Sequence, residues 1–334
     1  MRSVIANSPS AILFGVSGHN KAVFFRQLAT MVQAGLPVGK AVVTAGQHSL
    51  EALTAELALL IERHGKTLSE AMSLSFRRVQ FTPDLMPADI LGSEVLETAE
   101  DGSRSFRFLP GPIFCQLLMA DEINRASPRT QSALLQAMQE HRVSVAGKYY
   151  DLPEPFHVLA TQNPLELEGT YPLPEAQLDR FLFNIVVDYP SEDEEREIIR
   201  RVTSPGEGEV KALMDAKDIL QLQEIVKRVP VGDHVIDFAA DIARATRPNS
   251  GEAPEFVKDM VGWGAGPRAG IAMISAAKAH AVLRGRFHAT TGDVAAVAHP
   301  VLRHRVLTTF NAEASGVQSD DIVRMLLEHL EPKD

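Results

Sequence analysis

The feature that most constrains this chain is a short apolar run that ends in two adjacent acids. Residues Leu117 to Ala120 are apolar without alternation, and Asp121 and Glu122 follow them directly. Such a run is typical of a strand buried on both faces of a parallel sheet. Open α/β sheets bind their ligands at the carboxyl ends of these strands. Two neighbouring carboxylates are costly there unless a cation or a reacting water uses them. We therefore expect a functional site at this strand end; an exposed strand end followed by a turn is the alternative.

Composition and charge limit the class of protein. The 334 residues include 45% hydrophobic side chains, enough for two or three domains with a sizeable core. The net charge of -10 argues against a nucleic-acid partner. The single cysteine, Cys115, lies in the apolar region, which excludes an internal disulfide and fits a reducing cytoplasm. No uncharged run approaches the roughly 18–20 residues of a membrane helix, so we expect a cytoplasmic protein without a membrane span.

Further strands and hairpins surround the acid pair in the sequence. Residues 76–81 and 156–161 predict strands, and residues 93–109 and 143–152 predict hairpins. The second strand is followed by Asn163, whose amide can orient a water molecule or a phosphate oxygen if the strands are parallel. The alternative for Asn163, which precedes a proline, is a hydrogen bond to its own turn.

Two helices are predicted next to these strands. Residues 129–140, which begin after the capping residue Ser127, form the first, and residues 175–183 form the second. Asp179 and Arg180 are expected on the exposed side of the second helix, where alone they would form a solvated ion pair. The side chains expected on the buried face of the first helix are Ser132, Leu135 and Met138.

Long strings within residues 74–190 resemble the MoxR-type AAA+ ATPases, in order and almost without gaps. They include FTPDLMPADILGSEV, LLMADEINRASPRTQSALLQAMQE and LPEPFHVLATQNPLELEGTYPLPEAQLDRF. The resemblance implies that Asp121 binds Mg²⁺ and that Glu122 polarises the attacking water, which together form the Walker B site. It further implies that Asn163 is the sensor that holds this water against the γ-phosphate. Arg180 matches the arginine finger, which acts in trans on the nucleotide of a neighbouring subunit.

The same resemblance sets expectations for fold, assembly and partners. It implies an α/β fold, with a three-layer AAA+ core and parallel sheet over residues 74–190 and an all-helical lid over residues 191–334. ATP and Mg²⁺ would bind between core and lid. Arg268, at a helix N-terminus in the lid, would act as the second sensor and point at the nucleotide. Members of this family form hexameric rings and remodel protein clients, often clients with von Willebrand A domains.

The lid sequence itself predicts a series of amphipathic helices separated by short turns. A capped helix with an acidic first turn begins after Ser191. The histidines of this region show no metal-ligand spacing, so they are interpreted as ordinary helix residues. The further helices are predicted at residues 216–228, 233–245, 267–284, 291–302 and 319–330.

The phosphate cradle that this scheme needs, G-x-x-x-x-G-K-[ST] after a strand, is not intact anywhere in the chain. Gly65, Lys66 and Thr67 match its last three positions, but Leu60 stands where the first glycine belongs. Residues 57–63 are also predicted as helix. A helix there would keep the backbone amides from curling around a phosphate, so this candidate is weak.

A second weak candidate for the cradle is the string GVSGHNKA, which follows a predicted strand and precedes a predicted helix. Gly15, Gly18 and Lys21 would form it. Asn20 replaces the second glycine, and Ala22 replaces the hydroxyl that should bind Mg²⁺. The loss of such contacts to the phosphates is expected to cost several kcal/mol of transition-state stabilisation. Hydrolysis therefore does not follow from the fold alone.

Residues 1–73 are expected to form a separate helical segment. The strings FFRQLAT, AGLP and GKTLSEAM within residues 20–73 resemble the helical domain of type II secretion F proteins. The segment is compatible with a natural fusion, a gene-model artefact or a degenerate ATPase. The alternative to an ATP-driven motor is a non-hydrolysing, AAA+-derived scaffold. Its N-terminal hairpin would dock onto a secretion or pilus platform.

Overall fold

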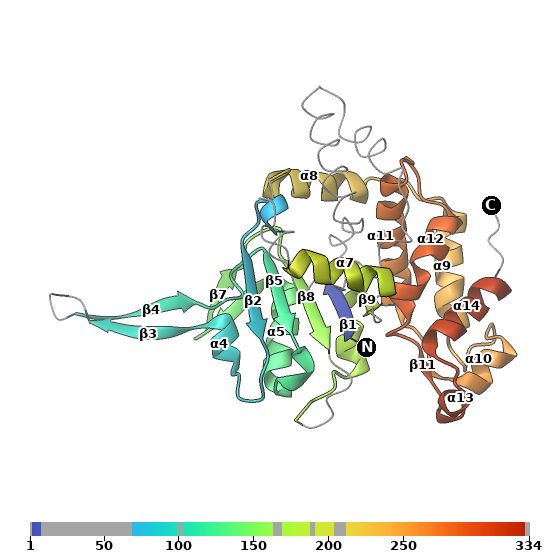
Figure 1. Cartoon of the computed structure of the whole chain (residues 1–334), viewed down its shortest axis with the longest axis horizontal. Helices are drawn as coiled ribbons and strands as arrows, with labels where there is room; N and C mark the ends of the chain where they lie inside the picture. The colour runs from blue at the N-terminus through green and yellow to red at the C-terminus, as the bar shows by residue number, and fades with distance from the viewer. Residues whose placement is uncertain are drawn as a thin grey trace.

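The computed structural model describes residues 2–7, 69–98, 100, 103–162, 169–187, 191–203 and 212–330. In these residues an α/β core lies beside a helical lid (Figure 1). The parallel-sheet core and the helical carboxyl-terminal lid expected from the sequence are confirmed. The predicted N-terminal hairpin and the predicted strand at residues 10–16 lie outside the described residues, apart from residues 69–73 at the end of that segment. The helical structure that the resemblance to secretion F proteins implies for this segment therefore stays a prediction.

The described part of the core contains a five-stranded sheet in the order β2-β5-β8-β1-β9. β2, β5 and β8 are parallel neighbours, and β9 runs in the same direction as they do. The two predicted strands at residues 76–81 and 156–161 are confirmed to within one residue. The five strands are β1 (Arg2–Asn7), β2 (Phe76–Gln80), β5 (Leu117–Asp121), β8 (His157–Gln162) and β9 (Phe181–Val187).

Strand β1 differs from the expected parallel sheet because it runs antiparallel to both of its neighbours. Its backbone pairs with β8, from Ser3 opposite Gln162 to Ala6 opposite Leu159, and with β9 on the other side. The sequence did not predict this strand. Its six residues are half polar and lack a clear period, so pairing on both sides, rather than local pattern, makes them a strand.

Helix α5 (Pro128–Glu140) forms as predicted and packs against the sheet. The Ser127 hydroxyl accepts a hydrogen bond from the Thr130 backbone amide at 3.3 Å, and Pro128 occupies the first helical position. Leu135 and Met138 are buried, as predicted, but Ser132 is exposed. The prediction for Ser132 is wrong because the buried stripe is centred one residue earlier in that turn, on Gln131.

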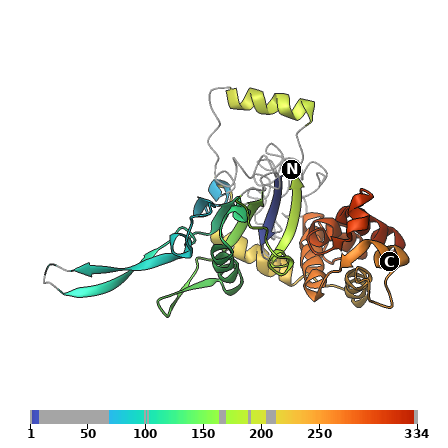
Figure 2. The ribbon, with the colours of Figure 1, turned by 90° about the horizontal axis from the view of Figure 1, so that it is seen from below.

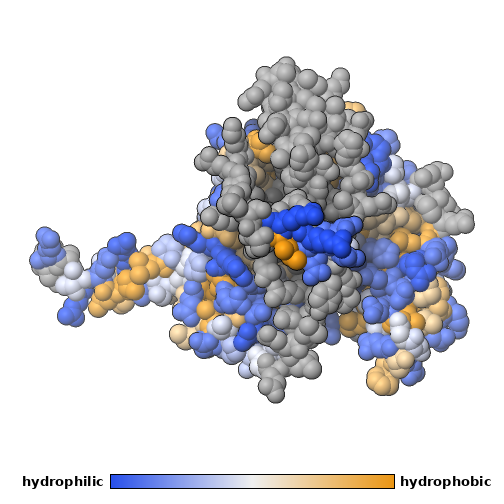
Figure 3. Space-filling view, viewed as in Figure 1, coloured by the Kyte–Doolittle hydropathy of each residue, from blue (hydrophilic) through white to orange (hydrophobic). Residues whose placement is uncertain are grey.

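Two hairpins extend the core at the β2 side of the sheet, and both predicted hairpins are confirmed. The ring of Phe108 in the first stacks on Tyr150 in the second at 3.9 Å, and Lys148 pairs with Glu94 at 3.0 Å. Beyond this anchor the first hairpin projects away from the body (Figure 2) and carries apolar surface (Figure 3). The strands are β3 (Gly92–Thr98), β4 (Arg104–Pro110), β6 (Arg142–Val145) and β7 (Lys148–Asp151), and the short helix α4 (Pro87–Leu91) precedes β3.

The predicted helix over residues 175–183 is shorter than expected. Helix α6 (Glu175–Leu178) has a single turn, and strand β9 begins at Phe181. The prediction failed because Phe181 and Leu182 fit a helical stripe and a buried strand equally well. In the structure their backbone carbonyls accept hydrogen bonds from Arg305 of the lid, at 2.7 and 3.2 Å, and this tertiary contact favours the strand.

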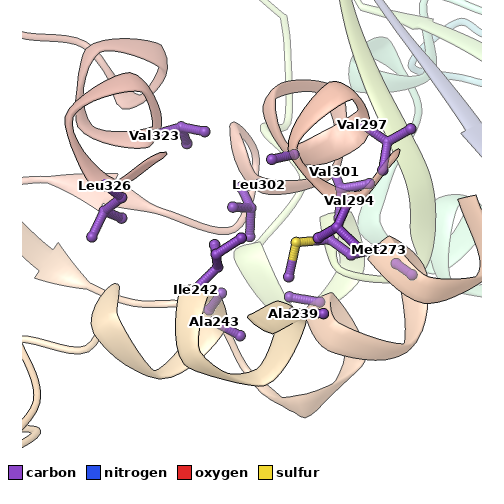
Figure 4. Close-up of a cluster of buried hydrophobic side chains, with 14 of the residues drawn as sticks. Ala239, Ile242, Ala243, Met273, Val294, Val297, Val301, Leu302, Val323 and Leu326 are labelled. Atoms are coloured by element: carbon purple, nitrogen blue, oxygen red, sulfur yellow. The ribbon is translucent and has the colours of Figure 1, made fainter. Parts of the chain in front are cut away.

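Most helices of the lid were predicted within one residue at each end. Those over residues 233–245, 267–283, 291–302 and 319–329 pack into a bundle, whereas the helix over residues 192–203 stands apart from it (Figure 2). The core of the bundle brings together Ile242, Met273, Val294, Leu302 and Leu326, all of them buried (Figure 4). The helices are α7 (Glu192–Thr203), α8 (Ala216–Lys227), α9 (Asp233–Ala245), α10 (Glu255–Met260), α11 (Pro267–Leu283), α12 (Thr291–Leu302), α13 (Phe310–Ala314) and α14 (Ser319–His329); β10 (Val261–Trp263) pairs with β11 (Leu307–Thr308).

Two further expectations from the sequence concern Cys115 and membrane-spanning helices. Cys115 is buried, and burial raises the pKa of its thiol to about 12, so it is an inert core residue. Among the helices that the structure describes, none combines the length and the apolar character that crossing a membrane requires.

Candidate active site

The acid pair lies where the sequence places it, at the carboxyl end of a buried strand. All five residues of β5 are buried, and Asp121, its last residue, is 6% exposed. Glu122 follows with φ 54° and ψ 50°, in the left-handed region that a residue other than glycine seldom adopts. Such a backbone costs on the order of 1 kcal/mol, and it turns the Glu122 side chain away from the strand direction. A strained residue at this position points to function rather than packing.

Thr161 on the neighbouring strand β8 holds both acids in place. Its hydroxyl donates to Asp121 Oδ1 at 2.5 Å and accepts from the Glu122 backbone amide at 2.9 Å. The register of the two parallel strands, with Ala120 opposite Ala160, brings these groups side by side. One hydroxyl thus fixes the orientation of the first carboxylate and the backbone of the second.

Strand β2, on the other side of β5, contributes a cation and an amide. Arg78 Nη2 lies 2.5 Å from Asp121 Oδ2, and Gln80 Nε2 donates to Glu122 Oε2 at 2.7 Å. Residues two apart on a strand face the same side, so Arg78 and Gln80 reach the two consecutive acids together. Arg125 also pairs with Glu122 Oε2, at 3.1 Å. Both contacts of Glu122 fall on Oε2, and among the described residues no donor is recorded on Oε1.

A second cluster gathers the arginines that the sequence singled out. Asp179 Oδ1 accepts from Arg305 Nε at 2.7 Å, and its other oxygen lies 3.4 Å from Arg268 Nη1. The alternative for this pair, a solvated contact between Asp179 and Arg180, is not what the structure shows: two arginines of the lid contact the Asp179 carboxylate instead. The buried Nε of Arg180 has no hydrogen-bond partner among the described residues.

The two clusters lie at opposite ends of the parallel strands, Asp121 at the carboxyl end of β5 and Asp179 before the amino end of β9. Through the register of β5, β8, β1 and β9, Ala120 is level with Asn184, so Asp179 precedes the amino end of β9 while Asp121 ends β5. Three strand spacings separate β5 from β9, and Asp179 lies six residues before Ile185, the residue level with Asp121, so the two clusters are roughly 20–25 Å apart. Arg268 does begin a helix, as predicted, and its guanidinium lies 3.4 Å from Asp179 rather than beside Asp121 of the same chain. Its role toward a nucleotide stays a prediction.

Several predicted site residues lie outside the described part of the chain, so their roles stay predictions. These are Asn163 and both candidates for the phosphate cradle, Gly15, Gly18 and Lys21 or Gly65, Lys66 and Thr67. The described residues contain no group of three or more His, Cys, Asp and Glu side chains that could hold a metal ion.

Sequence reasoning missed four residues that shape the two clusters: Arg78, Gln80, Thr161 and Arg305. Alternation along residues 76–80 carried a signal for the first two, because it places both on one face of a strand predicted to lie near the acids. No local pattern marks Arg305, which is 126 residues from Asp179 in the chain.

Comparisons with known proteins agree with this arrangement. The family described as "ATPase family associated with various cellular activities (AAA)" matches residues 60–183, and an AAA lid domain matches residues 255–326. The chain is 43% identical over 265 residues to the chaperone MoxR1 of Mycobacterium tuberculosis, an alignment that covers 79% of this chain and 69% of the relative. The chain belongs to the MoxR family of AAA+ ATPases.

Other relatives support membership of the MoxR family. Protein YeaC of Bacillus subtilis is 39% identical over 289 residues, which cover 84% of this chain and 86% of the relative. Protein MoxR of Paracoccus denitrificans is 32% identical over 259 residues, with 72% and 74% covered. The crystal structure of an ATPase candidate from Cytophaga hutchinsonii superposes with a TM-score of 0.77 at 30% identity, covering 95% of this chain and 98% of that one.

Proposed function

We propose that this MoxR-family chain is an ATP-driven chaperone that remodels protein partners in the cytoplasm. The observation that carries the proposal is the acid pair at the carboxyl end of β5, in which Asp121 is buried, Glu122 has a strained backbone and Thr161 orients both. MoxR1, the relative at 43% identity, is named a chaperone. As working units we propose the AAA+ core at residues 74–190, the lid at residues 191–334 and the N-terminal segment at residues 1–73.

The donors at the acid pair fit Mg²⁺, which prefers oxygen ligands. Asp121 would hold the ion through one carboxylate oxygen, and Mg²⁺ bound with ATP would neutralise the charge of the phosphates. Among the described residues no donor contacts Glu122 Oε1, so this oxygen could accept a hydrogen bond from a water molecule, and Glu122 would act as the base that polarises it. Asn163, which follows β8 in the sequence, would hold the same water.

For the phosphate cradle we favour the later of the two candidates. The AAA family match begins at residue 60 and so includes Gly65, Lys66 and Thr67, whereas residues 15–21 lie outside it. The GKT string would be the remnant of the cradle in a shortened segment before β2.

We further propose that Arg180 and Arg268 both act on the nucleotide of a neighbouring subunit. They lie close to Asp179, at the opposite end of the strands from Asp121, and their own acids are roughly 20–25 Å away. A closed ring, for which we propose a hexamer, would bring this end of one chain's sheet to the acids of the next. Clients with von Willebrand A domains belong to the same proposal.

A non-hydrolysing scaffold is the second candidate, and two observations favour it. No G-x-x-x-x-G-K-[ST] string is intact. Strand β1 also runs antiparallel, so its carboxyl end, Asn7, lies at the edge away from Asp121 rather than beside it. In this case the N-terminal segment would dock onto a secretion or pilus platform.

Binding of Mg-ATP to the purified protein distinguishes the two candidates. We expect Glu122→Gln to keep the wild-type affinity for Mg-ATP in calorimetry and to lower ATP turnover by about 10²–10³-fold, because it removes the base but not the cation ligand. The exposed Glu313→Gln is the matched control and should leave both quantities unchanged. No detectable Mg-ATP binding by the wild-type chain would contradict the motor and leave the scaffold.

A further inference from the structure

Asp121 uses both carboxylate oxygens in the described structure, and the two contacts differ in kind. Oδ1 accepts from the Thr161 hydroxyl at 2.5 Å, and Oδ2 lies 2.5 Å from Arg78 Nη2. The Thr161 contact is buried and supported on its other side by the Glu122 amide. It therefore fixes the carboxylate, and Oδ2 is the oxygen left for a cation.

Arg78 already occupies that oxygen. An oxygen that ligates Mg²⁺ lies about 2.0–2.1 Å from the ion, so a guanidinium nitrogen in contact with Oδ2 stands where the ion would bind. A positive group there also repels a second cation. Arg78 and a divalent cation therefore compete for Oδ2.

The same geometry lets Arg78 leave. Its side chain is 45% exposed, whereas that of Asp121 is 9% exposed. β2 is an edge strand of the described sheet, so nothing beyond it in the sheet encloses Arg78. The Arg78 guanidinium would remain in water after leaving Asp121, so separating this pair costs less than separating one in which both partners are buried. The contact balances the buried carboxylate but can be displaced by a cation that takes its place.

We propose that Arg78 is a built-in counter-ion that competes with the divalent cation for Asp121 and must swing away before the cation binds. The inference rests on the proposed function only in taking Asp121 as the cation ligand. When no cation is bound, Arg78 neutralises a carboxylate that would otherwise be buried with an unpaired charge. Arg78 thus acts as a positioning residue that sets the cation concentration at which the site loads.

Mn²⁺ affinity of the full chain, measured by electron paramagnetic resonance without nucleotide, tests the competition. We expect Arg78→Gln to tighten Mn²⁺ binding by about 5- to 10-fold, because it removes both the competitor and its repulsion. Arg77→Gln is the matched control: it removes the same charge from the opposite face of β2 and should leave the affinity near that of the wild type. A merely structural role for Arg78 would weaken binding, not tighten it.

Further variants separate the failure of this inference from failure of the proposed site. Asp121→Asn should abolish Mn²⁺ binding, which leaves the full signal of free Mn²⁺ at every protein concentration. Suppose that Asp121→Asn loses Mn²⁺ binding while Arg78→Gln binds Mn²⁺ with wild-type or lower affinity. The proposed competition is then wrong, but Asp121 remains the cation ligand. If Mn²⁺ binding does not depend on Asp121, both are wrong. Arg78→Lys keeps the charge, so it should bind within about twofold of the wild type, and tightening equal to that of Arg78→Gln would contradict the inference.

Discussion

Replacing Arg305 by methionine is expected to release the lid from the core. The Arg305 side chain is 3% exposed and joins the lid to the segment that leads into β9. It pairs with the Asp179 carboxylate and donates to the backbone carbonyls of Asp179, Phe181 and Leu182. Methionine fills a similar volume without a donor, so these acceptors lose their partner. Breaking a buried pair from one side costs about 3–5 kcal/mol.

Thermal unfolding and limited proteolysis measure this effect. We expect the Arg305→Met protein to unfold in two transitions, lid and core separately, with early cleavage near residues 179–181 under native conditions. Arg324→Met, which removes an exposed arginine of the lid helix α14, serves as control and should unfold as the wild type. A single transition at the wild-type temperature in Arg305→Met would show that the lid is held by other contacts.

Replacing Asp293 by asparagine is expected to destabilise the lid by about 3 kcal/mol, near the lower end for a buried charge pair. Asp293 is fully buried and accepts hydrogen bonds from His280, Arg286 and Thr290. An amide cannot balance the Arg286 charge, which is 36% exposed and so partly solvated. Chemical denaturation at pH 7 measures the difference, and Asp241→Asn, on the exposed side of α9, is the control of equal chemistry.

The pH dependence of this difference follows from the pKa of Asp293. Burial alone would raise this pKa, but the hydrogen bonds from His280, Arg286 and Thr290 outweigh it and hold the pKa well below its usual range. A carboxyl whose pKa is depressed by folding stabilises the protein above its unfolded pKa, about 3.9, and loses that contribution as pH falls. The gap in unfolding free energy between wild type and Asp293→Asn should therefore narrow from pH 5 toward pH 3. A gap that stays constant or widens would contradict the assignment.

The sequence predicted correctly those strands and helices that neighbouring residues in the chain determine. The unbroken apolar run of β5 placed Asp121 and Glu122 at the right strand end, and residues 233–245 and 291–302 became helices with the predicted bounds. These elements combine a clear period with a capping residue or a sharp end, so chain neighbours decide them.

Long-range contacts decide what the sequence could not predict. Arg78 meets Asp121 only because two strands 43 residues apart become neighbours, and Arg305 meets Asp179 across 126 residues. The same contacts turn residues 181–183 into strand and direct Arg268 to Asp179, away from Asp121. The family resemblance indicated which residues are candidates for the site. It did not indicate which of them lie together within one chain.

The most direct test of the account is turnover in mixed rings, because the account assigns the acids and the arginines of one site to different chains. Glu122→Gln chains keep both arginines, and Arg268→Ala chains keep the acids. Each alone should be nearly inactive, and rings co-assembled from equal amounts should regain about a quarter of wild-type ATP turnover, since one neighbouring pair in four is complete. Arg180→Ala mixed with Arg268→Ala should regain none. Mixed Glu122→Gln and Arg268→Ala rings that remain at the level of either parent would contradict the account.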